Sequence, residues 1–112
     1  WTGGGLVTNP RDLALWAKRL YEGKAMAGAY VDELLMRAGP GGTPPVGYGL
    51  GVEIRPSALG PAYGHRGWTP GYLSIFAYYP RYGLAAALQI NELGAYDMAA
   101  FVDGLTQVAV QP

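Results

Sequence analysis

The part of the sequence that most constrains the fold is a ten-residue stretch, Tyr63-Gly64-His65-Arg66-Gly67-Trp68-Thr69-Pro70-Gly71-Tyr72. It holds the chain's single histidine, and four of its residues are glycine or proline. Pro70 presets φ at the second position of a β-turn, and Gly71 permits the positive φ that a type II turn requires at the third. Glycines within a strand leave the main chain uncovered, which suits a strand along which a substrate lies. We therefore predict a strand beside a cleft, a tight turn and a second strand.

The length and composition indicate a single domain with few charged residues. At 112 residues the chain has the length of a single domain, eight acidic side chains balance eight basic ones, and 14% of the residues are charged. We therefore expect no nucleic-acid partner. No apolar run reaches the roughly 20 residues of a membrane helix, so we predict no membrane span. With no cysteine and one histidine, the sequence predicts no metal site and no cofactor, and it leaves the compartment open.

Three segments have the pattern of helices, at about 9–22, 29–38 and 95–110. The first has Asn9 at the N-cap and Pro10 at the first helical position. Trp16 lies on the apolar stripe of this helix, which predicts that its indole is a core anchor. The second helix should end before a loop over 39–47. The third should carry Asp97 in its first turn.

Four segments have the pattern of strands, at about 48–54, 62–68, 72–79 and 84–91. Segment 48–54 alternates between large apolar residues and small or polar ones, and we expect a loop over 55–61. Segment 72–79 is apolar on both faces, which predicts an interior strand covered on both sides, and the alanines of 84–91 predict a closely packed helix. Short connections make an antiparallel meander. The predicted fold class is α+β, an antiparallel β-meander of about four strands with helices packed on it.

Taken by themselves, the side chains supply no complete catalytic set. Ser57 and Ser74 lie in neither a Gly-x-Ser-x-Gly elbow nor a Ser-x-x-Lys pattern, and we expect Ser74 to be a strand residue. A lone histidine such as His65 is more often structural than catalytic. The carboxylates have the positions of surface residues and helix-dipole partners: Asp12, Asp32, Glu33, Asp97 and Asp103.

Three segments, in this order, resemble the C-terminal part of the serine β-lactamase and penicillin-binding-protein superfamily. They are Gly4-Gly5-Leu6-Val7-Thr8-Asn9-Pro10-Arg11-Asp12-Leu13-Ala14, Tyr48-Gly49-Leu50-Gly51-Val52, and Gly64-His65-Arg66-Gly67-Trp68-Thr69-Pro70-Gly71-Tyr72. Within the superfamily they are most similar to the group of class C β-lactamases, DD-peptidases and family VIII esterases. The resemblance covers nearly the whole chain. It implies that residues 1–112 are the C-terminal part of the α/β domain of a β-lactamase-like serine hydrolase.

The third active-site motif of that family is Lys-Thr-Gly or His-x-Gly on a strand at the cleft, and His65-Arg66-Gly67 is its counterpart here. The resemblance implies that His65 supplies a hydrogen bond or positive charge near the catalytic Tyr/Lys and the substrate. Gly67 would let the substrate approach, Thr69 would contact it, and the backbone N–H of Trp68 would be one oxyanion-hole donor. Arg66 replaces the hydroxyl residue of Lys-Thr-Gly. It either pairs with a substrate carboxylate or, as strand alternation favours, points away from His65 as a solvated charge.

Two other motifs of the family, Ser-x-x-Lys and Tyr-x-Asn, are missing from the sequence. They supply the nucleophile and the general base, so we expect this chain by itself to be inactive. Its beginning, from Trp1, carries no initiator methionine and no signal-peptide pattern, and reads as the middle of a longer protein. We therefore expect a C-terminal fragment of a serine hydrolase that cleaves a β-lactam, a D-amino-acid peptide or an ester through an acyl-serine.

The partners expected for such a fragment are a small-molecule or peptide substrate and the N-terminal remainder of the protein, with Ser-x-x-Lys and Tyr-x-Asn. The alternative is a non-catalytic module. It would bind a partner or self-associate through the open sheet edge at 84–91.

Overall fold

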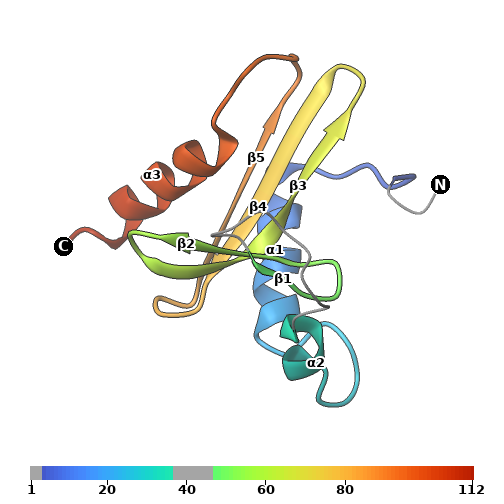
Figure 1. The fold of residues 1–112 in the computed structure, drawn as a ribbon, viewed down its shortest axis with the longest axis vertical. Coiled ribbons are helices and arrows are strands. Elements are labelled where there is room, and N and C mark those ends of the chain that lie inside the picture. Colours follow the sequence, from blue (N-terminus) through green and yellow to red (C-terminus); the bar gives the residue numbers. More distant parts are fainter. Residues whose placement is uncertain (1–3, 37–46) are drawn as a thin grey trace.

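The computed structural model describes residues 4–36 and 47–112. In chain order, its elements are α1 (Pro10–Tyr21), α2 (Val31–Leu35), β1 (Gly47–Tyr48), β2 (Glu53–Ser57), β3 (Gly60–Thr69), β4 (Tyr72–Tyr79), β5 (Leu84–Ile90) and α3 (Met98–Val110). The strands form one five-stranded sheet in the order β1-β2-β3-β4-β5, and every neighbouring pair is antiparallel (Figure 1). The predicted α+β class is therefore confirmed, with five strands in place of about four.

Helix α1 begins and ends where its sequence signals lie. The Asn9 side chain accepts a hydrogen bond from the Asp12 amide at 3.0 Å, and Asn9 Nδ2 donates to Asp12 Oδ2 at 2.7 Å. Pro10 occupies the first helical position. Gly23 has a φ of +72°, which stops the helix at little steric cost because glycine has no Cβ.

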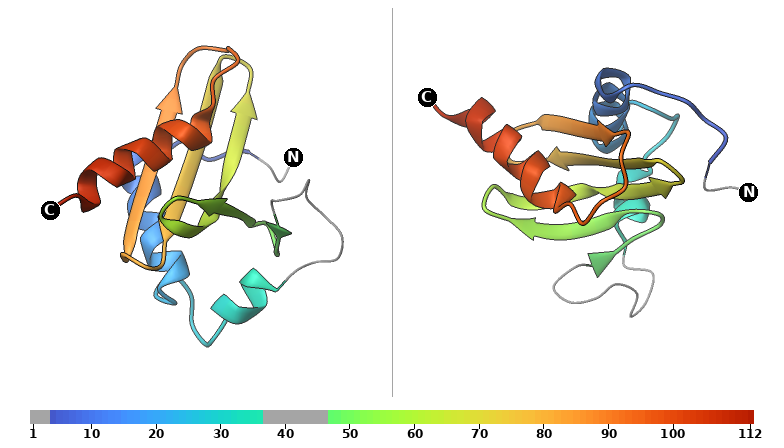
Figure 2. Two further views of the ribbon diagram at one scale, coloured as in Figure 1. Left: turned by 60° about the vertical axis from the view of Figure 1, so that its left-hand side comes forward. Right: turned by 90° about the horizontal axis from the view of Figure 1, so that it is seen from above.

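The sheet separates two cores, with α1 on one face and α3 on the other (Figure 2). Strand β4 contributes alternately to both, since Ile75, Ala77 and Tyr79 pack on the α3 side while Tyr78 packs on the α1 side. The prediction of an interior strand at 72–79 is thus confirmed. The alanines of β5 also serve both helices, with Ala85 against the α1 core and Ala86 against the α3 core.

The predicted strand at 48–54 is wrong, because the chain turns back within it. Strands β1 and β2 pair antiparallel, with Tyr48 opposite Glu53, and Gly51 between them has a φ of +71°. A Cβ on Gly49 would lie 2.4 Å from the Leu34 carbonyl oxygen, so only glycine fits there. The turn is closed by a hydrogen bond of 2.8 Å from the Gly49 amide to the Val52 carbonyl.

The predicted loop at 55–61 is also wrong, because β2 and β3 continue into it. They are joined by a tight turn in which the Ser57 hydroxyl donates to the Gly60 carbonyl at 2.7 Å and accepts from the Leu59 amide at 3.1 Å. Gly60 supplies the positive φ, +96°. This short turn leaves Arg55 inside β2, where its side chain reaches α3.

Two helices differ from their predicted bounds. The helix predicted at 29–38 is helical only at Val31–Leu35, and its predicted end, with most of the loop at 39–47, lies outside the described residues. Helix α3 begins at Met98, so Asp97 is its N-cap and not a first-turn residue; its carboxylate accepts from the Ala100 amide at 3.0 Å. Within the described ranges, no helix combines the length and apolarity needed to cross a membrane.

Asp103 is not the surface residue that its helical position predicts. Arg55 donates to both of its carboxylate oxygens, at 2.7 and 2.6 Å, and the Tyr79 hydroxyl donates to one of them. Burial works against the charge of Asp103, but the hydrogen bonds from Arg55 and Tyr79 prevail and lower its pKa. Burial, followed by the bond to Asp103, raises the pKa of Tyr79 to about 12. The network ties β2 and β4 to α3.

Candidate functional site

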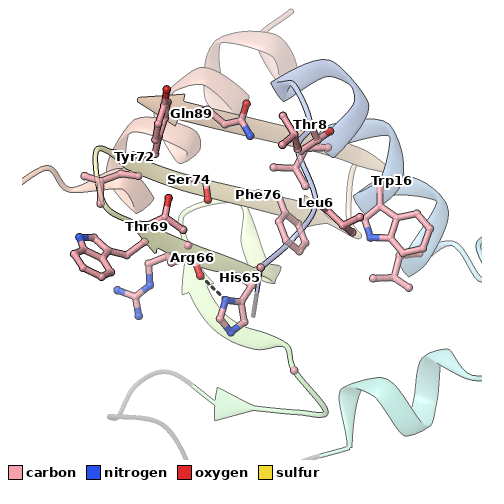
Figure 3. A pocket seen from close by; sticks show the side chains of 18 of the residues that line it. Leu6, Thr8, Trp16, His65, Arg66, Thr69, Tyr72, Ser74, Phe76 and Gln89 are labelled. Carbon is pink, nitrogen blue, oxygen red and sulfur yellow. Dashed lines mark hydrogen bonds between the residues drawn. The ribbon is translucent and has the colours of Figure 1, made fainter. Parts of the chain in front are cut away.

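A groove of about 980 Å³ lies on the α1 side of the sheet. Its walls are the segment Gly4–Thr8, helix α1 and the strands β3, β4 and β5 (Figure 3). The five residues predicted for the site all line it: His65, Arg66, Gly67, Trp68 and Thr69. They come from the last part of β3, so one strand brings them together.

His65 is half-buried in β3 and has both ring nitrogens engaged. Its Nε2 lies 2.6 Å from the hydroxyl oxygen of Tyr48, and its Nδ1 lies 2.5 Å from the carbonyl oxygen of Arg66. The Tyr48 and His65 rings meet edge to face, with an interplanar angle of 78°. Sequence reasoning did not select Tyr48, which reaches His65 because the chain turns back between β1 and β2.

The main chain of β3 has an open edge next to His65. Pairing with β2 ends at Glu53 opposite Gly64, and within the described residues no strand covers β3 on that side beyond Gly64. Main-chain groups along an antiparallel strand point alternately to its two neighbours, and the residues that flank a two-residue turn pair with each other. Counted in this way, the main-chain N–H and C=O groups of Arg66 and Trp68 point toward the open edge. The contact of the His65 ring with the Arg66 carbonyl oxygen is consistent with this direction. The Trp68 amide is therefore directed past the end of β2.

Gly67 leaves room for a hydroxyl group from the neighbouring strand. It pairs with Ser74 of β4, and a Cβ at position 67 would lie 2.3 Å from Ser74 Oγ. Ser74 is a strand residue, as predicted, and it also lines the groove. Thr69 ends β3 before the turn, where Gly71 has the predicted positive φ of +86°.

Arg66 points its guanidinium away from His65 and binds Glu53. Arg66 Nε donates to the two carboxylate oxygens of Glu53 at 3.1 and 3.0 Å. Glu53 is largely buried, whereas the Arg66 side chain is mostly exposed. Because strand residues alternate between faces, Arg66 lies on the α3 face and His65 on the groove face. The charge of Arg66 thus has a protein partner that the sequence did not predict.

Trp16 is not the core anchor that the helical stripe predicts. Its side chain is 48% exposed and lines the groove, while Ala17 and Tyr21 of the same helix are buried against the sheet. The apolar stripe of α1 is wider than the surface that the sheet covers, so the residue at its margin stays accessible. Leu6, just before α1, is also almost fully exposed beside the groove.

The described side chains can bind and polarise a ligand, but they do not form an activated nucleophile. Both nitrogens of His65 are taken by Tyr48 and the Arg66 carbonyl, so this imidazole does not serve as a base for Ser74. Within residues 4–36 and 47–112, no three acidic or histidine side chains gather as metal ligands would.

The fold and groove define a class of domain: an antiparallel sheet between helices, with a glycine-rich strand presenting uncovered main chain. A family model described as Beta-lactamase matches residues 2–110. This match spans almost the whole chain, so the chain belongs to the beta-lactamase family. A comparison with curated proteins gives no match.

Proposed function

We propose that the chain supplies the C-terminal wall of the active site in a serine hydrolase that works through an acyl-serine. The observation that carries the proposal is the open edge of β3, where the main-chain groups of Arg66 and Trp68, two residues that line the groove, point away from β4 and meet no neighbouring strand among the described residues. The sequence has no Ser-x-x-Lys or Tyr-x-Asn. The nucleophile and general base therefore belong to another part of the protein, which lies beside the open edge of β3.

The substrate lies along β3 as an added strand, held by main-chain hydrogen bonds. When the nucleophilic serine Oγ attacks the substrate carbonyl carbon, the carbonyl oxygen becomes an oxyanion. The Trp68 N–H donates to it, together with the serine's own N–H. The general base takes the proton of the serine hydroxyl and passes it to the leaving amine or alcohol, whose bond to the carbonyl carbon breaks to leave the acyl-serine. Each oxyanion donor contributes about 3–4 kcal/mol to transition-state stabilisation. Water then hydrolyses the acyl-serine.

The neighbouring residues shape this wall. Gly67 keeps the strand free of a side chain where the substrate passes, and Thr69 offers a hydroxyl at the end of the strand. Arg66 contacts the substrate through its main chain, while Glu53 holds its guanidinium on the other face. The His-x-Gly motif favours a peptidase or esterase of the class C, DD-peptidase and family VIII group over an efficient β-lactamase.

The sharpest test removes the Trp68 N–H alone, in the protein together with the region encoded upstream. Trp68→Pro deletes this amide, and proline is tolerated where the amide faces away from the sheet. We expect kcat to fall by about 10²–10³-fold. Trp68→Ala is the matched control, because it removes the exposed indole and keeps the N–H. Equal activity in the two variants would remove the oxyanion role.

Two further measurements test whether the nucleophile lies outside this chain and whether His65 contributes to turnover. The 112-residue chain, incubated with a fluorescent penicillin, should show no covalent adduct by mass spectrometry, whereas the longer protein should be labelled at its Ser-x-x-Lys serine. An adduct on the chain alone would show that a nucleophile is present after all. In the longer protein, His65→Ala should lower turnover and leave folding intact; loss of folding would make His65 a core residue.

The second candidate is a non-catalytic module that self-associates. It is favoured by β5, which pairs only with β4 within the described residues, and by the exposed apolar side chains Phe101, Leu105 and Val108 along α3. Sedimentation should then show a concentration-dependent dimer that Phe101→Lys weakens. A start codon immediately before Trp1 would favour this candidate over the hydrolase.

A further inference from the structure

The protonation pattern of His65 follows from its two contacts. Nδ1 faces the Arg66 carbonyl oxygen at 2.5 Å, and a carbonyl oxygen can only accept a hydrogen bond. Nδ1 must therefore carry the proton. In the neutral imidazole Nε2 is then bare, and the Tyr48 hydroxyl at 2.6 Å must donate to it. One tautomer of the neutral ring satisfies both contacts.

The backbone at Tyr48 is held by its pairing with β2 and by the contacts of the residue that follows it. It pairs with Glu53 of β2, and the residue after it, Gly49, donates its amide to the Val52 carbonyl at 2.8 Å. Position 49 lies so close to the Leu34 carbonyl that a Cβ there would be 2.4 Å from the oxygen. The hydroxyl is thus presented to His65 by a backbone with little freedom to shift.

Resting on the proposed function, we propose that Tyr48 is a positioning residue that, together with the Arg66 carbonyl, holds His65 in the Nδ1–H tautomer and withholds its Nε2 from general-base chemistry. If His65 takes up a proton, the contact persists with its roles exchanged. Nε2–H then donates to the Tyr48 oxygen, and the Tyr48 O–H becomes available to another acceptor. His65 thus acts on the substrate as an oriented, fixed group and not by abstracting a proton.

The single histidine makes this directly measurable in the ¹⁵N-labelled 112-residue chain. In the neutral ring, we expect an imidazole spectrum with a protonated Nδ1 and an unprotonated, hydrogen-bonded Nε2. A predominantly Nε2–H ring in the wild-type chain would overturn the proposal, and this spectrum decides even if a variant fails to fold.

Tyr48→Phe removes the hydroxyl that donates to Nε2 and should shift the Nε2 signal, while Nδ1 keeps its proton because the Arg66 carbonyl remains its acceptor. Tyr82→Phe is the matched control, because it removes a hydroxyl in the turn between β4 and β5 and should leave the His65 signals unchanged. Unchanged ring signals in a folded Tyr48→Phe chain would refute the role of Tyr48.

Kinetics of the longer protein separate this inference from the proposed function. We expect Tyr48→Phe to lower kcat roughly tenfold with little change in KM, and the double variant with His65→Ala to be no slower than His65→Ala. Additive losses would mean that Tyr48 acts independently of His65. If the tautomer is as expected but no acyl transfer occurs, the proposed function fails while the assignment of the tautomer stands.

Discussion

Adding one methyl group at Gly64 should separate two central strands of the sheet. Gly64 is buried in β3, between Glu53 of β2 and Ala77 of β4. A Cβ built there would lie 1.9 Å from the carbonyl oxygen of Phe76 and 3.1 Å from the Cα of Ala77. Both contacts are with backbone atoms, which cannot rotate away as a side chain could.

The cost follows from the distance that the strands must move. Observed Cβ contacts essentially never fall below 3.0 Å, so the Phe76 carbonyl must retreat by about 1 Å. A hydrogen bond of about 2.9 Å stretched by that amount is lost. Losing two or three ladder bonds at about 1 kcal/mol each, less about 0.5 kcal/mol gained by replacing glycine with alanine in a strand, leaves about 2 kcal/mol. For a domain of this size the melting temperature should fall by roughly 10 °C.

Urea unfolding followed by circular dichroism measures the loss, and Gly104→Ala is the control. A Cβ at Gly104 of α3 meets no atom within 4 Å. This substitution should raise the free energy of unfolding by about 1 kcal/mol, because alanine favours a helix interior over glycine by that amount. The same chemical change thus has opposite signs at the two positions. A Gly64→Ala protein as stable as the wild type would refute the reasoning from close strand approach.

Three further outcomes follow from the same contacts. Gly67→Ala should destabilise by about 1–2 kcal/mol in urea unfolding, and Ser74→Ala should restore most of the loss because the crowding atom is a side-chain oxygen 2.3 Å away. Folding lowers the pKa of Asp103, so the stabilisation by its carboxylate is present above the unfolded pKa of about 3.9 and is lost as pH falls through the folded value. The free energy of unfolding of Asp103→Asn, measured at several pH values, should therefore fall less in acid than that of the wild type. Folding raises the pKa of Tyr79 to about 12, so the stabilisation by its neutral hydroxyl is present below about pH 10 and is lost as pH rises toward 12. The free energy of unfolding of Tyr79→Phe should therefore fall less in alkali than that of the wild type. The same fall in both proteins would contradict the assignment.

The sequence predicts elements well where one residue fixes its own backbone. Asn9 and Pro10 set the start of α1, and Gly71 sets the turn that separates β3 from β4. The alternation at 48–54 fails for the opposite reason. An alternating pattern with glycines fits one strand or two strands around a turn, and the carbonyl of Leu34, from a separate segment, excludes a side chain at Gly49.

Burial was harder to predict than secondary structure. The stripe of α1 indicates which side of the helix is apolar, but not how much of that side the sheet covers, so Trp16 was misplaced. The sequence predicts Asp103 to be a surface residue because a carboxylate on a helix normally faces solvent unless a cation pairs with it. That cation, Arg55, reaches α3 only because β2 continues through residues predicted to be loop.

In the candidate site, too, the sequence predicts what lies on one strand but not the contacts between strands. The five residues predicted from the sequence are consecutive on one strand, so no tertiary information was needed to group them. The partners that define their chemistry come from other strands: Tyr48 for His65, Glu53 for Arg66 and Ser74 for Gly67. Finding them requires the register of the sheet, which the sequence specifies only at the tight turns.

The direction of the Trp68 amide could have been predicted from one such turn. If the turn at 70–71 makes Thr69 pair with Tyr72, alternation sends the amides of every second residue of β3 to β4 and the others, including that of Trp68, to the opposite edge. Whether that edge is open depends on how far β2 extends. Because of the turn at Gly49–Val52, β2 begins only at Glu53, opposite Gly64, and a β2 that began earlier would have covered the amide of Trp68. The same glycine-containing turn that presents Tyr48 to His65 thus also leaves the edge of β3 uncovered.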